Sequence, residues 1–274
     1  MRVFKLTLST FLTFAALQVS AARAEIAVLE PIKDGTLYED FFGTRANGAG
    51  NHFFVGQTGQ LVVVRGVLEF DVEGGVPRGA TLLSASLSLH MSRTLNNQEI
   101  HTVGLHRVSE EWGEAGSVAT QGEGGGAAAQ DGDATWRYTF FSTDSWASLG
   151  GDFDPVALAS TDVSAVGFYS WTSPELLADV QLFHEEPSQN HGWILIGNEV
   201  LPRAKRFDTR ENPDVGVRPQ LIIEFEPLWL PSLAPAGFAL LVVVMAAAAA
   251  GSLSRSRMSL RRAQARGRRS ARVQ

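Results

Sequence analysis

The chain has 274 residues, 45% of them hydrophobic and 9% aromatic, and this composition excludes wholesale disorder. Charge is segregated. Residues 1–24 and 251–274 contain no acid and hold 3 and 8 basic residues, which leaves 12 basic against 29 acidic residues between them, a formal charge of −17. We expect no nucleic-acid partner for so acidic a body. The absence of cysteine excludes a thiol nucleophile, thiolate metal sites, disulfides and a lipid-modified N-terminal cysteine.

Residues 1–24 have the features of a secretory signal peptide. Arg2 and Lys5 form a short positive region, an apolar stretch follows, and the segment ends in the small-x-small pattern Ala-Arg-Ala. The pattern predicts cleavage between Ala24 and Glu25 and export of the mature chain. The alternative is a buried N-terminal helix. A membrane anchor is excluded, because the apolar segment is shorter than the about 20 residues that an anchor needs.

The C-terminal end predicts a membrane segment with a cytoplasmic tail. Residues 228–250 contain a short Pro motif and then 18 consecutive residues, 233–250, without a polar side chain. Eight arginines follow in residues 251–274. Because basic residues stay on the cytoplasmic side, this transmembrane helix would run from outside to inside, which agrees with an exported body.

Leu230-Pro231-Ser232-Leu233 precedes the apolar segment directly. The order of Pro motif, apolar helix and Arg cluster resembles the C-terminal sorting signals of Gram-negative bacteria, and these four residues are similar to the Ile-Pro-Thr-Leu type. The resemblance implies cleavage by a membrane-embedded sorting protease and transfer from the inner membrane to the cell surface. A permanent membrane anchor is the alternative.

Between residues 25 and 227 the sequence predicts one all-β domain. Short β-rich runs are separated by Gly, Pro, Asn and Asp, a pattern typical of a single jelly-roll-like β-sandwich. In the clearest strand, Thr81 to Met91, apolar side chains alternate with serines and a histidine, which predicts one buried face. No stretch has a convincing helical period, and the Gly- and Ala-rich segment 115–133 predicts a flexible surface loop.

Ordered motifs between Ile32 and Glu226 resemble the DNRLRE-domain family. In chain order they are NHFFVG (51–56), RGVLEFD (65–71), VPRGAT (76–81), HRV (106–108) with Trp112, GGDFD (150–154), KRFDTREN (205–212) and RPQL (218–221). Members of this family are extracellular bacterial and archaeal β-sandwiches related to alginate-binding carbohydrate-binding modules. The resemblance therefore implies a β-sandwich that binds an extracellular polysaccharide.

Two groups of titratable residues invite a catalytic interpretation. The side chains of His106 and Glu114 could act as general acid and base, because His and Glu can exchange protons near neutral pH. The pairs Asp152/Asp154 and Asp131/Asp133 could supply the two carboxylates that hydrolysis of a glycosidic bond needs. A strand-to-loop corner with solvated acids explains the first group, and turn formation explains Asp152. The sequence has no Ser-His-Asp arrangement or phosphate loop, so we expect a protein that is not an enzyme.

Loop residues with oxygen ligands could hold a structural calcium ion, because this hard cation prefers carboxylate, amide and carbonyl oxygens. The candidates are Asp34, Asn51 and Asp71, with Asn47, Asp152 and Asp154 as further ones. The alternative is that these residues only form turns.

A polysaccharide site needs aromatic platforms beside positive charge. The candidates are Lys205, Arg206, Arg210, Trp136 and Trp146. In an extended strand Arg206 and Arg210 would face the same side, with Lys205 opposite. Two interpretations stay open for the arginines: they bind an anionic sugar, or they pair with carboxylates such as Glu69 or Asp208 and fasten the sandwich.

These observations predict a secreted, surface-displayed, non-catalytic β-sandwich that binds extracellular or cell-wall polysaccharide. One alternative is a structural surface or matrix protein without specific sugar binding. Another is a polysaccharide lyase or hydrolase, which would need clustered acid and base residues in a cleft.

Overall fold

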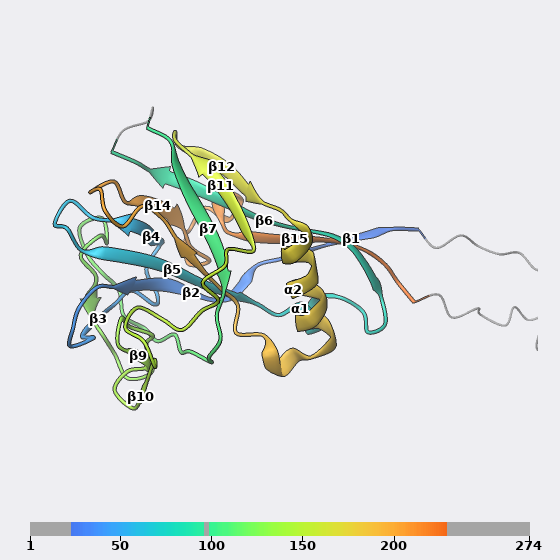
Figure 1. The fold of residues 1–274 in the computed structure, drawn as a ribbon, viewed down its shortest axis with the longest axis horizontal. Helices are drawn as coiled ribbons and strands as arrows, with labels where there is room; N and C mark the ends of the chain where they lie inside the picture. The colour runs from blue at the N-terminus through green and yellow to red at the C-terminus, as the bar shows by residue number, and fades with distance from the viewer. Residues whose placement is uncertain (1–22, 96–98, 229–274) are drawn as a thin grey trace, which may run out of the picture. The chain divides into compact units, whose positions relative to one another are not determined.

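The computed structural model describes residues 23–95 and 99–228 (Figure 1). Most of the predicted signal peptide, the sorting motif Leu230–Leu233, the apolar segment 233–250 and the Arg-rich tail lie outside the described residues. None of the described helices is long and apolar enough to cross a membrane. Glu25, which follows the predicted cleavage point, is the first residue of the first strand.

The described residues form mostly β structure, as the sequence predicts. Eleven strands make one antiparallel sheet with the path β1-β15-β6-β14-β4-β5-β13-β7-β11, while β12 pairs with β6 and β2 with β5. Two small sheets pair β9 with β10 and β3 with β8. The strands are β1 (Glu25–Leu29), β2 (Pro31–Tyr38), β3 (Arg45–Ala46), β4 (His52–Gln57), β5 (Val63–Phe70), β6 (Thr81–Arg93), β7 (His101–Arg107), β8 (Ala127–Ala128), β9 (Tyr138–Phe140), β10 (Asp144–Ser145), β11 (Ala159–Val163), β12 (Gly167–Trp171), β13 (Trp193–Ile196), β14 (Lys205–Asp208) and β15 (Gln220–Glu226).

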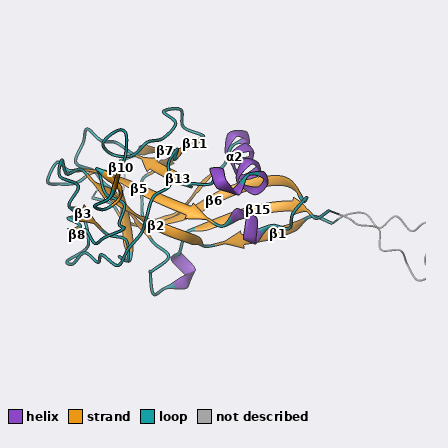
Figure 2. Ribbon diagram, turned by 90° about the horizontal axis from the view of Figure 1, so that it is seen from below, coloured by secondary structure: helices purple, strands orange, loops and turns teal. Residues whose placement is uncertain are grey.

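The sheet curls so that its two halves enclose one core (Figure 2). Strand β4 joins the halves, because residues 52–55 pair with β14 and residues 56–57 pair with β5. Gly56 has a φ of 109°, a conformation that glycine adopts without a steric penalty. Inside the curl Phe53 stacks on Phe207 with ring centroids 5.4 Å apart, and Trp171 and Trp193 are fully buried. Burial of such side chains stabilises the fold by about 1.5–3 kcal/mol each.

Strand β6 confirms the predicted alternation from Ala85 to Met91. Leu87, Leu89 and Met91 are fully buried, whereas Ser88 and His90 between them are partly exposed. Leu83, which the alternation placed on the buried face, is 40% exposed, and Leu82 is buried instead, where the register with β15 shifts. The strand is long enough to pair with β15 along most of its length and with β12 and β14 near its C-terminal end. The strand thus extends from the core to Arg93, its last residue.

One element contradicts the sequence-based prediction that no helix is present. Helix α2 (Pro174–Glu185) begins at Ser173, whose hydroxyl accepts the N–H of Leu176 at 2.9 Å. Its buried residues Leu176, Val180 and Phe183 recur at helical spacing and cover the core beside β6. The shorter helices are α1 (Val72–Gly75) and the 3-10 turns η1 (Pro187–Gln189) and η2 (Val215–Val217).

Segment 115–133 is not the loose surface loop that its composition predicts. The side chains of Ser117, Ala119 and Glu123 are buried, and the Ser117 hydroxyl accepts the N–H of Gly48 at 3.0 Å. The segment also contributes β8, which pairs with β3.

Candidate functional site

An open pocket of about 380 Å³ lies where β3, β4, β6 and β14 meet segment 115–133. Three arginines line it, Arg45 from β3, Arg93 from β6 and Arg206 from β14, and we call it the arginine pocket. Its other polar lining includes Gln60 and Gln121, and none of its described lining residues is acidic. A positive pocket on an acidic body suits an anionic ligand.

The two arginines of β6 and β14 face each other directly. Arg206 is the cross-strand partner of Arg93, and on its other side it is the partner of Phe54 in β4. Like charges at such a position destabilise a sheet. The Arg206 Nε donates to the Ser92 hydroxyl at 3.1 Å, and among the described residues neither arginine forms an ion pair with a carboxylate. Asp208 and Glu123 attract Arg206 from beyond contact distance, so no described carboxylate occupies its donors and the two guanidinium groups can contact a ligand.

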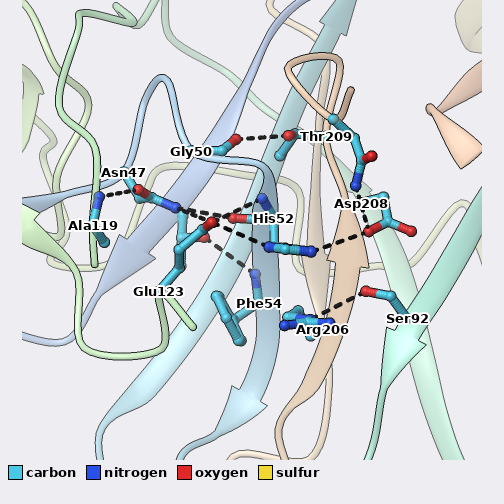
Figure 3. A network of polar contacts seen from close by, with 12 residues as sticks. Asn47, Gly50, His52, Phe54, Ser92, Ala119, Glu123, Arg206, Asp208 and Thr209 are labelled. Atoms are coloured by element: carbon cyan, nitrogen blue, oxygen red, sulfur yellow. Dashed lines mark hydrogen bonds and ion pairs between the residues drawn. The ribbon is translucent and has the colours of Figure 1, made fainter. Parts of the chain in front are cut away.

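A polar network of buried and partly buried residues lies beside Phe54 and Arg206, which line the arginine pocket (Figure 3). One carboxylate oxygen of Glu123 accepts the Asn47 amide at 3.0 Å and the His52 backbone N–H at 2.9 Å. The His52 ring lies between Glu123 and Asp208, at 3.2 and 3.4 Å. Although burial acts to raise it, hydrogen bonds from His52 and Asn47 hold the pKa of Glu123 below its usual value. Glu123 therefore stays charged, and its two sequence neighbours Gly122 and Gly124 line the pocket.

A second polar site, outside the arginine pocket, brings together Asp34, Glu114 and Glu211, which we call the acidic cluster. One carboxylate oxygen from each lies within 4.8 Å of the others. Asp34 is fully buried; its Oδ2 accepts the backbone N–H of Arg210 at 2.8 Å, and its own N–H donates to Glu114 Oε1 at 2.9 Å. Burial, followed by the charge of Glu211, raises the pKa of Asp34.

Arg210 belongs to the acidic cluster and does not line the arginine pocket. Its guanidinium contacts Glu114 and also lies 3.0 Å from Glu211 Oε1. Strand β14 ends at Asp208, so the extended geometry that would place Arg210 beside Arg206 does not continue that far. Arg210 therefore pairs with carboxylates, but its partners are Glu114 and Glu211 and not Glu69 or Asp208, which the sequence suggested.

The remaining predicted sugar-binding residues are buried outside the pocket. Lys205 is 2% exposed, donates to the Thr94 hydroxyl at 2.7 Å, and has its pKa lowered by burial. Trp136 and Trp146 lie in a core cluster with Trp112, and the Trp146 indole donates to a backbone carbonyl. Only Arg206 of the five candidates lines the arginine pocket.

The residues predicted to bind calcium are not gathered in one place. Asp34 joins the acidic cluster, whereas Asp71 caps α1 by accepting the Gly74 N–H at 2.8 Å. Asn51 is exposed and its carbonyl accepts the N–H of Thr209. The further candidates also have local roles: Asn47 bonds to Glu123, while Asp152 and Asp154 accept backbone N–H groups of their own turns.

The residues predicted to act as acid and base do not come together in one site. The His106 ring contacts the Asp154 carbonyl at 2.9 Å, and Arg107 pairs with Asp179 of α2 at 3.2 Å. Glu114 faces the acidic cluster. The sequence-based analysis missed Arg45, Arg93 and Glu211, because cross-strand register and loop packing, not spacing along the chain, bring them to these sites.

No family model matches the chain, and no curated protein matches it. The resemblance to the DNRLRE-domain family stays a prediction, and the function must be inferred from the site.

Proposed function

We propose that the protein is an exported, surface-displayed, non-catalytic β-sandwich of jelly-roll type that binds an anionic extracellular polysaccharide in the arginine pocket. The observation that carries the proposal is the facing pair Arg93 and Arg206, which line one pocket without a carboxylate partner. Two like charges at paired positions cost stability, and Asp208 and Glu123 offset only the charge of Arg206. A bound anion would remove that cost and gain charge-assisted hydrogen bonds.

The chemistry of the pocket favours acidic sugars over neutral ones. A guanidinium offers several N–H donors in a planar fork, which matches a carboxylate or a sulfate. Gln60 and Gln121 can exchange hydrogen bonds with sugar hydroxyls. Phe54 is only 7% exposed, so ring stacking contributes little and charge has the larger role.

Electrostatics predicts local binding against a repulsive background. The body between the two basic ends has a formal charge of −17, which opposes a polyanion at long range. At close range the ligand meets only the arginine pocket. Added salt screens both the repulsion between the acidic body and the ligand and the attraction between the arginines and the ligand. Binding is strongest at the salt concentration where the short-range attraction most exceeds the remaining repulsion.

The ends of the fold agree with export and sorting. Strand β1 begins at Glu25, where cleavage after Ala24 would leave the mature N-terminus, and β15 ends at Glu226, four residues before the motif that begins at Leu230. Both processing points would leave the sheet complete. Insertion in the inner membrane followed by a membrane-embedded sorting protease is the route that we propose to the cell surface.

The test is a titration of the purified full-length chain, held in a mild nonionic detergent, with soluble alginate and pectin fragments and with a neutral glucan. We expect the acidic fragments to bind and Arg206→Ala to weaken them by about 10- to 150-fold, the equivalent of one lost charged hydrogen bond. Arg78→Ala is the matched control, because Arg78 is 84% exposed, pairs with Glu73 and lies outside the pocket.

Binding of the acidic fragments that Arg206→Ala leaves unchanged would refute the arginine pocket as the site. No binding of any fragment would favour a structural surface protein instead. Loss of binding in both Arg206→Ala and Arg78→Ala would indicate a general charge effect.

A further inference from the structure

The acidic cluster contains two buried carboxylate oxygens that lack a hydrogen-bond partner. They are Asp34 Oδ1 and Glu211 Oε2, and each belongs to a side chain of the cluster. Asp34 is fully buried, so solvent does not satisfy its oxygen. A buried acceptor without a donor is costly, and a buried charge without a partner costs more.

Local charges do not balance within the cluster. When all three are ionised, Asp34, Glu114 and Glu211 supply three negative charges, and the one cation that contacts them among the described residues is Arg210. Arg210 reaches the two glutamates through its side chain and Asp34 only through its backbone N–H. The charge of Arg210 also acts on Asp34 from a distance, but Asp34 Oδ1 has no hydrogen-bond donor among the described residues.

We propose that the acidic cluster binds one calcium ion between Asp34, Glu114 and Glu211. All the donors are oxygens, as a hard cation requires, and a divalent ion cancels the two uncompensated charges. Calcium lies 2.3–2.6 Å from its ligands, so two oxygens across one ion can stand up to about 5.2 Å apart. The spread of 4.8 Å in the cluster meets that limit.

The cluster has a route for the ion to enter. The side chains of Glu211 and Arg210 are 20% and 35% exposed, so one side of the site reaches solvent although Asp34 does not. Water molecules on that side would complete the six to eight ligands that calcium takes. A proton shared by Asp34 and Glu211 is the competing occupant, and the test must separate the two.

The ion would connect three segments that are distant in sequence. Asp34 lies in β2, Glu114 opens the segment that reaches the arginine pocket at Gln121, and Glu211 follows β14, which carries Arg206. Calcium would thus hold both sides of the pocket relative to β2. The calcium site itself does not rest on the proposed polysaccharide binding.

The test uses the purified full-length chain in nonionic detergent, first stripped with EDTA and then titrated with CaCl₂ by calorimetry. We expect one calcium ion per chain with a dissociation constant of about 10⁻⁴–10⁻³ M, the range of extracellular modules. At a hundredfold excess over that constant the melting temperature should rise by about 5–10 °C. KCl at matched ionic strength should not reproduce the rise.

The variants Glu211→Gln and Glu114→Gln remove one ligand charge each and nearly preserve shape, and we expect each to weaken calcium binding about tenfold or more. Glu110→Gln is the matched control, because Glu110 is an exposed acid four residues before Glu114. Circular dichroism establishes that each variant is folded. The proposal is overturned if calcium and EDTA give the same melting temperature, as a shared proton predicts, or if both ligand variants bind calcium like the wild type.

Discussion

Because Arg93 and Arg206 face each other in the pocket, removing one of the two charges should stabilise the ligand-free protein and weaken ligand binding. Arg93→Gln keeps most of the side-chain stem and removes one of two like charges at paired positions of β6 and β14. Directly opposed like charges cost about 0.2–1 kcal/mol, and the lower part of that range applies because Arg93 is exposed and solvent screens its charge. The ligand-free variant should therefore be about 0.2–0.5 kcal/mol more stable than the wild type at low salt.

The assay is urea unfolding of the full-length chain in about 10 mM and about 500 mM salt, followed by titration with the acidic fragment that binds best. The Debye length falls from about 30 Å to a few ångströms over this range, so the stability gain should vanish at high salt. Affinity at low salt should fall about tenfold or more. A variant that is 1 kcal/mol less stable at low salt, or that binds like the wild type, would refute the reasoning, because Arg93 would then have a structural role.

Two further predictions concern the core. Burial raises the pKa of Asp179, although the Trp193 indole and Arg107 favour its charged form, so its stabilising contribution is complete below its unfolded pKa and is lost as the pH rises through its folded pKa. Asp179→Asn should flatten the decline in melting temperature as the pH rises above about 4, and equal slopes would contradict this. Trp146→Ala should cost about 3–5 kcal/mol in urea unfolding, because Trp146 is 6% exposed and packed in a core cluster, and a selective loss of sugar affinity at unchanged stability would show that it is a binding residue instead.

Local sequence pattern determined the fold class and the strongest strand. Alternation of apolar and polar residues has the same period as a strand, so Thr81 to Met91 could be identified without any knowledge of its neighbours. Helix α2 shows the limit of this reasoning. Its apolar positions have helical spacing, but within a chain dominated by strand signals a segment of 12 residues was overlooked.

The two candidate sites were decided by tertiary structure. Arg206 was identified from its charge, but its partner Arg93 lies on another strand and only the register of β6 with β14 brings them together. Asp34 was identified as a possible ligand, yet loop packing placed Glu114 and Glu211 beside it rather than Asn51 and Asp71.

The physical reason for this difference is the sequence distance between the residues that specify each feature. Periodicity, charge segregation and the terminal signals depend on residues that are neighbours in sequence, so the sequence by itself determined a mostly β body with an acidic charge and predicted its export. Register and loop packing depend on which distant strands bury their apolar faces together. Only the curled sheet could therefore decide which charged side chains meet at its edge.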